Sequence, residues 1–115
     1  MSRRPLAASK LGAIVLTLAI GACVGMTARA AAGVTQTITM DGTSFKPPDL
    51  TVKVGDTIVW KNEDPFPHTA TSTAGAFDSK PLAPSGSFTF TPKAKGDYPY
   101  KCTLHPTMRG MIHVK

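Results

Sequence analysis

Residues 50–62, LTVKVGDTIVWKN, decide the fold of this chain. Apolar and polar residues alternate on both sides of the Gly55-Asp56 turn, which is the pattern of β-strands that bury one face. The sequence therefore predicts strands at residues 50–54 and 57–62. Because the turn between them is tight, we expect the two strands to be neighbours.

Short alternating segments continue on both sides of this stretch. Further strands are predicted at residues 34–40, 87–91, 98–102 and 110–114. No segment shows a sustained helical period. Several short strands without helices predict an all-β fold, a small Greek-key β-sandwich with Trp60, Phe88 and Phe90 in its core.

The first thirty residues have the features of an export signal. A basic start is followed by an almost unbroken apolar run at residues 11–24, and Ala28-Arg29-Ala30 offers the small residues that a signal peptidase recognises. The apolar run of about 14 residues is short for a membrane span of about 20. We expect residues 1–30 to be a signal peptide that is removed, which leaves one domain at residues 31–115 in the periplasm.

Three alternatives for this leader stay open. They are a retained N-terminal anchor, a lipid attached at Cys23 of the lipobox-like residues 20–23, and a partial twin-arginine signal at residues 2–6. A mature chain that starts at Ala31, measured by mass spectrometry, would exclude the lipidated form.

The charge of the chain belongs mostly to the leader. The whole chain has 13 Lys and Arg against 7 Asp and Glu, a net charge of +6, but four of the cations and none of the acids precede Ala31. The remaining domain carries nine basic and seven acidic residues, which argues against a nucleic-acid-binding surface. It also keeps a single thiol, Cys102, which cannot form an internal disulfide and therefore points to a bound metal.

Three metal donors recur at every third residue between the last two predicted strands. They are Cys102, His105 and Met108 in YKCTLHPTM, residues 100–108. One loop can wrap only one side of a metal ion, so a fourth donor must come from elsewhere, and His68 in a turn-rich connection is the candidate. A thiolate, two imidazoles and a thioether are poor donors for zinc, calcium and magnesium as a set, and they match a blue-copper site.

The same residues have plainer interpretations. Cys102 can be an inert core thiol or form a hydrolytic dyad with His105, and Met111 is a rival of Met108 as axial ligand. We favour the ligand roles because the donors occur together at this spacing. His113, in the last predicted strand, is interpreted as structural.

The chain resembles the cupredoxin family of blue copper proteins, and within it the amicyanin group. Besides the Cys-x-x-His-x-x-Met spacing, residues 54–62 resemble the family's strand before the first ligand, and residues 96–102 resemble its strand into the thiolate. The resemblance implies one copper ion per chain, Cu(I) or Cu(II), bound through Nδ1 of both imidazoles. Thr69 departs from the family pattern, in which an Asn often ties the two ligand loops together.

These features predict a monomeric periplasmic electron carrier that is not an enzyme and binds no nucleic acid. Four donors leave no open coordination position for a substrate. We expect the electron to leave through the edge of His105, beside an apolar docking surface of residues 65–67 (Pro65, Phe66 and Pro67), Leu104 and Pro106. By resemblance, the redox partners would be a dehydrogenase and a c-type cytochrome. A copper chaperone, store or sensor, and a metal-free structural sandwich, remain as alternative functions.

Overall fold

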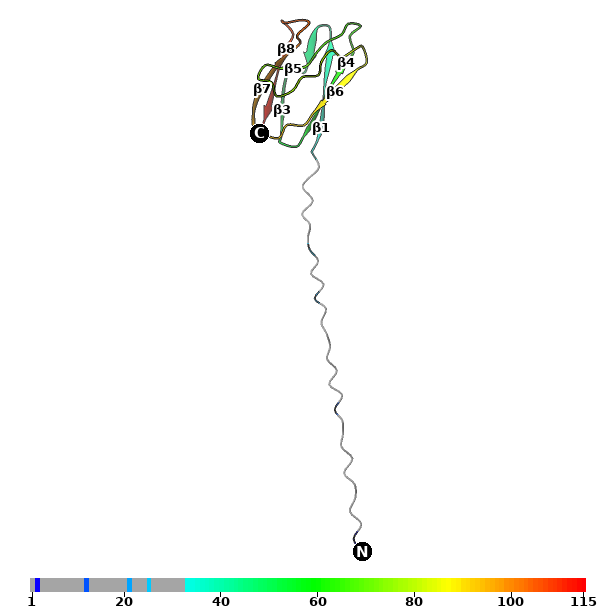
Figure 1. Ribbon diagram of the computed structural model, residues 1–115, viewed down its shortest axis with the longest axis vertical. Helices are drawn as coiled ribbons and strands as arrows, with labels where there is room; N and C mark the ends of the chain where they lie inside the picture. The colour runs from blue at the N-terminus through cyan, green and yellow to red at the C-terminus, as the bar shows by residue number, and fades with distance from the viewer. Residues whose placement is uncertain (1, 3–11, 13–20, 22–24, 26–32) are drawn as a thin grey trace.

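Two four-stranded β-sheets form the folded part of the chain (Figure 1). The computed structural model describes residues 2, 12, 21, 25 and 33–115, so the predicted signal peptide, its cleavage site and Cys23 lie outside the described residues, apart from four single positions. The strands are β1 (Thr35–Asp41), β2 (Ser44–Lys46), β3 (Asp49–Val52), β4 (Thr57–Asn62), β5 (Thr71–Ser72), β6 (Ser87–Phe90), β7 (Gly96–Lys101) and β8 (Arg109–Val114).

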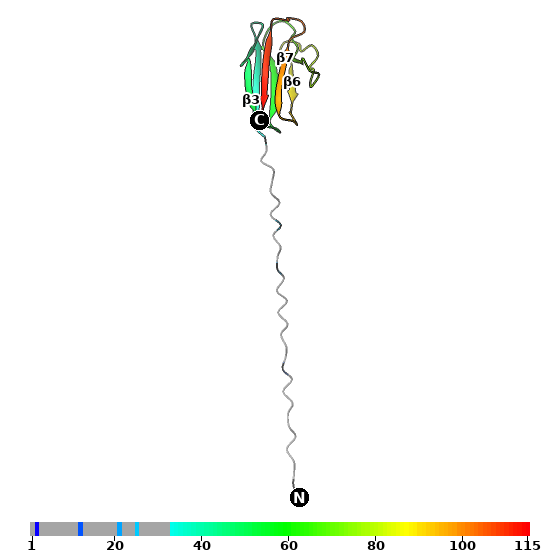
Figure 2. The same cartoon turned by 90° about the vertical axis from the view of Figure 1, so that its left-hand side faces the viewer.

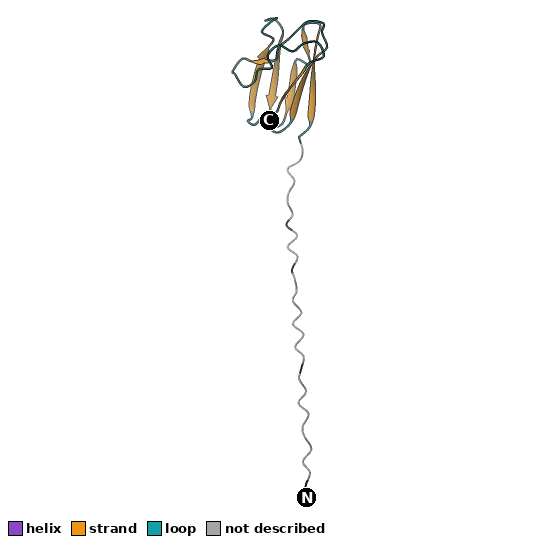
Figure 3. Ribbon diagram, turned by 45° about the vertical axis from the view of Figure 1, so that its right-hand side comes forward, coloured by secondary structure: helices purple, strands orange, loops and turns teal. Residues whose placement is uncertain are grey.

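The strand order is β2-β1-β4-β6 in one sheet and β3-β8-β7-β5 in the other. Strand β1 runs parallel to β4 and β3 runs parallel to β8, whereas the other pairs are antiparallel. Figure 2 shows β8, in red, between β3 and β7. Strands and loops account for the whole described fold, as the colouring of Figure 3 shows, and the predicted all-β sandwich is confirmed. Within the described residues, no helix has the length and apolar character needed to span a membrane.

The expectation that residues 50–54 and 57–62 would be neighbouring strands is wrong. Strand β3 pairs with β8, whereas β4 pairs with β1 and β6 in the opposite sheet. The turn at Gly55, whose φ is +90°, carries the chain from one sheet to the other. This crossing lets Val52 and Trp60, on either side of the turn, bury their side chains in the same core.

The core lies between the two sheets and is rich in aromatic side chains. Trp60 is fully buried, as predicted, and its ring contacts Tyr100 edge to face with centroids 5.4 Å apart. Phe88 and Phe90 are only partly buried and pack against this cluster. The other buried apolar residues are Ile38, Met40, Phe45, Val52, Ile58, Ala70, Phe77, Cys102, Met108, Ile112 and Val114. The core therefore reaches the end of the sandwich where the predicted ligands lie.

Strand β8 comes unusually close to the ring of Tyr100. In the ladder of β7 and β8, Gly110 lies directly opposite Tyr100. A Cβ atom on Gly110 would collide with the Tyr100 ring and hydroxyl, so only glycine leaves room for the buried ring. This contact fixes the strand that follows the predicted ligand loop.

Candidate metal centre

The four predicted ligands come from two connections at one end of the sandwich. His68 lies after β4, in an isolated bridge with Leu82. His68 N donates to Leu82 O at 3.2 Å, and Leu82 N donates to His68 O at 2.7 Å. Cys102, His105 and Met108 lie in the loop between β7 and β8, at the end of the molecule away from the C-terminus (Figure 1). The two sheets thus bring together residues more than thirty positions apart.

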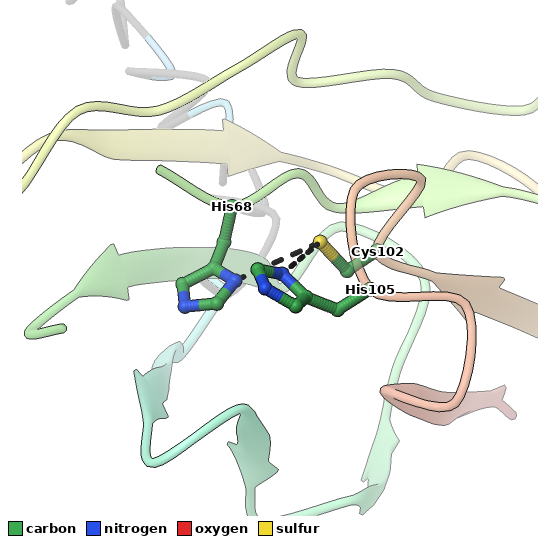
Figure 4. Close-up of side chains that lie close together, drawn as sticks. All are labelled: His68, Cys102 and His105. Carbon is green, nitrogen blue, oxygen red and sulfur yellow. Dashed lines mark hydrogen bonds between the residues drawn. The ribbon is translucent and has the colours of Figure 1, made fainter. Parts of the chain in front are cut away.

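Three of the predicted donors meet around one point. The Nδ1 atoms of His68 and His105 lie 3.7 and 3.9 Å from Cys102 Sγ, along the dashed lines of Figure 4. All three donor atoms lie within 4.8 Å of one another, and no other group of His, Cys, Asp and Glu in the described part of the chain does so. His68 and Cys102 are fully buried, whereas His105 is half-buried.

This spacing fits a single metal ion in the plane of the three atoms. Metal–nitrogen and metal–sulfur bonds of about 2.0 and 2.3 Å that meet at about 120° put the two donor atoms about 3.7 Å apart. The separations between the two imidazoles and Cys102 Sγ match this value. The cluster can therefore close on a metal ion with little movement.

Met108 closes the loop that carries the other two donors. Its N–H donates to His105 O at 2.8 Å, and its carbonyl accepts from Cys102 N at 3.0 Å. Met108 is buried, at 2% exposure, before β8 begins. The rival Met111 instead lies within β8, opposite Pro99, where its N–H donates to Pro48 O at 2.8 Å. Met108 thus lies in the same loop as Cys102 and His105, whereas Met111 lies in β8, and the ligand role of Met108 stays a prediction.

Asp64 fixes the orientation of the His68 ring. His68 Nε2 lies 2.6 Å from Asp64 Oδ2, and the carboxylate also accepts from Gly42 N at 2.7 Å and Thr43 N at 3.1 Å. The Thr43 N–H, helped by Gly42 and His68, holds the pKa of Asp64 below its ordinary value. Because an ionised carboxylate can only accept, His68 Nε2 is the donor in this contact, and in the neutral imidazole Nδ1 then directs its lone pair toward Cys102.

Asn62 organises the loop that presents His68. Its side chain donates to Phe66 O at 2.8 Å and Leu82 O at 2.9 Å, and accepts from Asp64 N at 2.9 Å. Neither Asn62 nor Asp64 was predicted as a functional residue from the sequence. The Asn-x-Asp spacing is a signal that could have found the turn, because an Asn side chain often accepts from the backbone two residues on. The contact of Asp64 with His68 has no such local signal.

Thr69 ties the two ligand loops together although it replaces the usual amide. Its backbone N–H donates to Cys102 Sγ at 3.3 Å, and its hydroxyl accepts from Thr103 N at 2.9 Å. Thr69 is 2% exposed, and its bond to Cys102 Sγ is buried. The departure noted in the sequence therefore leaves the loop connection in place, carried by a hydroxyl.

The remaining predicted residues lie on the surface. Phe66, two residues before His68, and Leu104, inside the loop between β7 and β8, are 63% and 47% exposed, which is high for large apolar side chains. Pro106 is also exposed. His113 lies outside the cluster on β8, where its Nδ1 is 2.7 Å from Asp97 Oδ1.

Comparison with known proteins gives a consistent set of relatives. Residues 12–114 match the family model described as a cupredoxin-like domain. Amicyanin from Paracoccus denitrificans is 38% identical over 78 residues, which cover 62% of this chain and 58% of that protein. Amicyanin-alpha from Methylorubrum extorquens is 29% identical, over 62% of this chain and 64% of that one. The chain thus spans less than two thirds of these relatives' length.

Solved structures show the same likeness in three dimensions. The Cu(I) form of a methionine-to-alanine variant of amicyanin superposes with a TM-score of 0.66 at 29% identity, covering 73% of this chain and 83% of that one. The Cu(I) form of a methionine-to-glutamine variant gives a TM-score of 0.67 at 29% identity, covering 70% and 82%.

Proposed function

Because this chain belongs to the family of cupredoxin-like domains, we propose that it is a one-electron carrier whose cofactor is a single type 1 copper ion. The ligands are His68, Cys102, His105 and Met108. The observation that carries this proposal is the convergence of two imidazole Nδ1 atoms on one buried thiol, at 3.7 and 3.9 Å. Two imidazoles, one thiolate and a weak axial thioether are the donors that blue copper uses.

The protein's part in electron transfer is to hold these donors still. Bound copper supplies a centre that gains or loses one electron. His68 is held by Asp64 and by the bridge to Leu82, and Cys102 by the N–H of Thr69. Ligands that are fixed by buried hydrogen bonds have little room to rearrange when the charge changes. Such a site suits fast electron exchange.

The half-buried His105 is the proposed exit for the electron. Leu104, its neighbour in the chain, and Phe66, two residues before His68, are exposed apolar side chains. An exposed apolar patch is typical of a docking surface, and a small one suits brief encounters with redox partners. With all four donors on the metal, no position remains for a substrate, which favours a carrier over an enzyme.

The cellular setting is also a proposal. The leader-like residues 1–30 support export to the periplasm, with a mature domain at residues 31–115. A dehydrogenase and a c-type cytochrome are the partner classes that the amicyanin resemblance implies. Cell fractionation with mass spectrometry of the mature N-terminus tests the location.

The visible spectrum after addition of Cu(II) tests the function. We expect one equivalent of copper to give an intense blue thiolate band that ascorbate bleaches and that Cys102→Ser abolishes. Met108→Gln should shift the band, whereas the matched variant Met111→Gln should leave it unchanged, because Met111 belongs to β8. A colourless protein, or equal copper binding without Cys102, would refute the carrier. Tight binding of Cu(I) alone would instead indicate copper handling.

A further inference from the structure

A chain of hydroxyl groups leads away from the sulfur ligand toward the surface. Thr69, whose N–H contacts Cys102 Sγ, accepts from Thr103 N at 2.9 Å through its hydroxyl. The Thr71 hydroxyl lies 2.9 Å from Thr69 Oγ1 and 3.2 Å from Asp78 Oδ1. Thr69 and Thr71 therefore connect the ligand loops to the carboxylate of Asp78, which is not among the proposed ligands.

A tight hairpin holds the outer part of this chain in register. Thr71 forms an isolated bridge with Asp78, and Ser72 N donates to Phe77 O at 2.9 Å. Phe77 is buried in the core, which anchors the hairpin to the sandwich. Strand β5 thus places the Thr71 hydroxyl next to Thr69, and the bridge to Asp78 brings a carboxylate to the same hydroxyl.

The charge of Asp78 sets the direction of the outer contacts. The backbone N–H of Lys80 donates to the carboxylate at 2.9 Å, and Lys80 Nζ lies 3.2 Å from it. The backbone and ammonium of Lys80 together hold the pKa of Asp78 below its ordinary value. An ionised carboxylate only accepts, and the one hydroxyl proton of Thr71 lies within reach of both Asp78 and Thr69. Asp78 therefore restricts how the Thr71 hydroxyl can turn.

We propose that Thr71 and Asp78 are positioning residues of the copper site, acting through Thr69 on the sulfur of Cys102. This inference rests on the proposed function. The N–H of Thr69 lies 3.3 Å from Cys102 Sγ and withdraws electron density from the sulfur. Hydrogen bonds around a ligand tune the metal that it binds. Loss of the contacts from Thr71 to Thr69 and to Asp78 loosens Thr69 and weakens its N–H contact with the sulfur. More electron density then stays on the sulfur, which favours the oxidised metal.

Two variants and a matched control test the proposal. Thr71→Val removes the hydroxyl at nearly constant shape, and Asp78→Asn removes the charge. Thr73→Val is the control, because Thr73 lies on the same hairpin and its hydroxyl donates only to Pro99 O, at 3.3 Å. In the copper-loaded protein we expect both variants to lower the reduction potential and shift the thiolate band, and the control to change neither.

Hydrogen exchange in the metal-free protein gives a second readout that needs no copper. The amide of Thr103, which donates to Thr69, should exchange about fivefold faster in Thr71→Val and Asp78→Asn, as expected for one weakened hydrogen bond. Unchanged Thr103 exchange together with an unchanged potential would overturn the proposal. A wild-type protein without a blue band would refute the copper site itself, while the exchange rates still decide whether the hydroxyl chain holds the loop.

A double variant separates positioning from independent effects. If Asp78 acts through Thr69, then adding Asp78→Asn to Thr69→Val should produce no further change in Thr103 exchange or in the potential. Additive shifts would show that Asp78 acts independently of Thr69, and would overturn the proposal.

Discussion

Replacing Asn62 by alanine tests how strongly one buried side chain holds the loop of His68. Asn62 is fully buried, and its amide makes three hydrogen bonds within the connection between β4 and Leu82. Alanine leaves Phe66 O and Asp64 N–H without their side-chain partner. Leu82 O keeps a donor, because His68 N also reaches it at 3.2 Å. One buried group, Asp64 N–H, and one part-buried group, Phe66 O, therefore lose their partners.

The expected loss of stability follows from this count. Each unsatisfied group costs about 1–3 kcal/mol, so the loss of both partners should lower the free energy of unfolding by about 2–6 kcal/mol. A domain of about 80 residues is stable by only about 4–12 kcal/mol. For a domain of this size, each kcal/mol lowers Tm by about 4–8 °C. The substitution should therefore lower Tm by about 10 °C or more, enough to leave the domain marginal.

Chemical denaturation of the metal-free protein, followed by circular dichroism, measures this effect without the contribution of bound metal. Glu63→Ala is the matched control, because the neighbouring Glu63 is exposed and its ion pair with Lys61, the one it forms within the described residues, spans 3.9 Å. We expect the control to change the free energy of unfolding by no more than about 0.5 kcal/mol. A loss below about 1 kcal/mol for Asn62→Ala would show that the amide network does not hold this loop.

Three further predictions concern separate parts of the fold. Gly110→Ala should lower the denaturation midpoint by the equivalent of about 1–3 kcal/mol, because its Cβ would collide with Tyr100; wild-type stability would contradict the close packing. Asp56 accepts two backbone N–H groups that hold its pKa below the ordinary value, so its stabilisation is complete above about pH 4 and is lost as pH falls through the lower folded-state pKa. Asp56→Asn should therefore flatten the acid dependence of unfolding, and an unchanged acid limb would argue otherwise. Asp64→Asn should weaken copper binding by about 10–100-fold in a chelator competition, since it removes the charge that orients His68; equal affinity would remove Asp64 from that role.

Local patterns carried the fold prediction where alternation was regular. The predicted strand at residues 57–62 has the same bounds as β4, and the strand predicted at residues 110–114 lies within β8. The pairing of residues 50–54 with 57–62 failed because alternation defines a buried face and not the sheet that contains it. Strand β5 has two residues, which is too short for any periodic signal.

Part of the candidate site could likewise be predicted from the sequence, and part could not. Donor identity and spacing are local, so the cluster of His68, Cys102 and His105 was readable from the sequence. The supporting contacts are not local. The carboxylate of Asp64 accepts from the turn after β1, and Thr69 meets Thr103 more than thirty residues away. Such partners depend on how the two sheets pack, which no window of sequence contains.

The ligand loops and the two termini of the folded domain lie on opposite sides of the sandwich (Figure 1). Thr57 N donates to Val34 O at 2.9 Å, and Val54 N donates to Lys115 O at 3.3 Å. The first and last residues of the folded domain therefore lie close together, on the side opposite the ligand loops (Figure 1). A tether, a second domain or an electrode linker joined to either terminus would therefore be attached on the side opposite the ligand loops. A protein attached in this way would keep its ligand loops, with His105, accessible to redox partners.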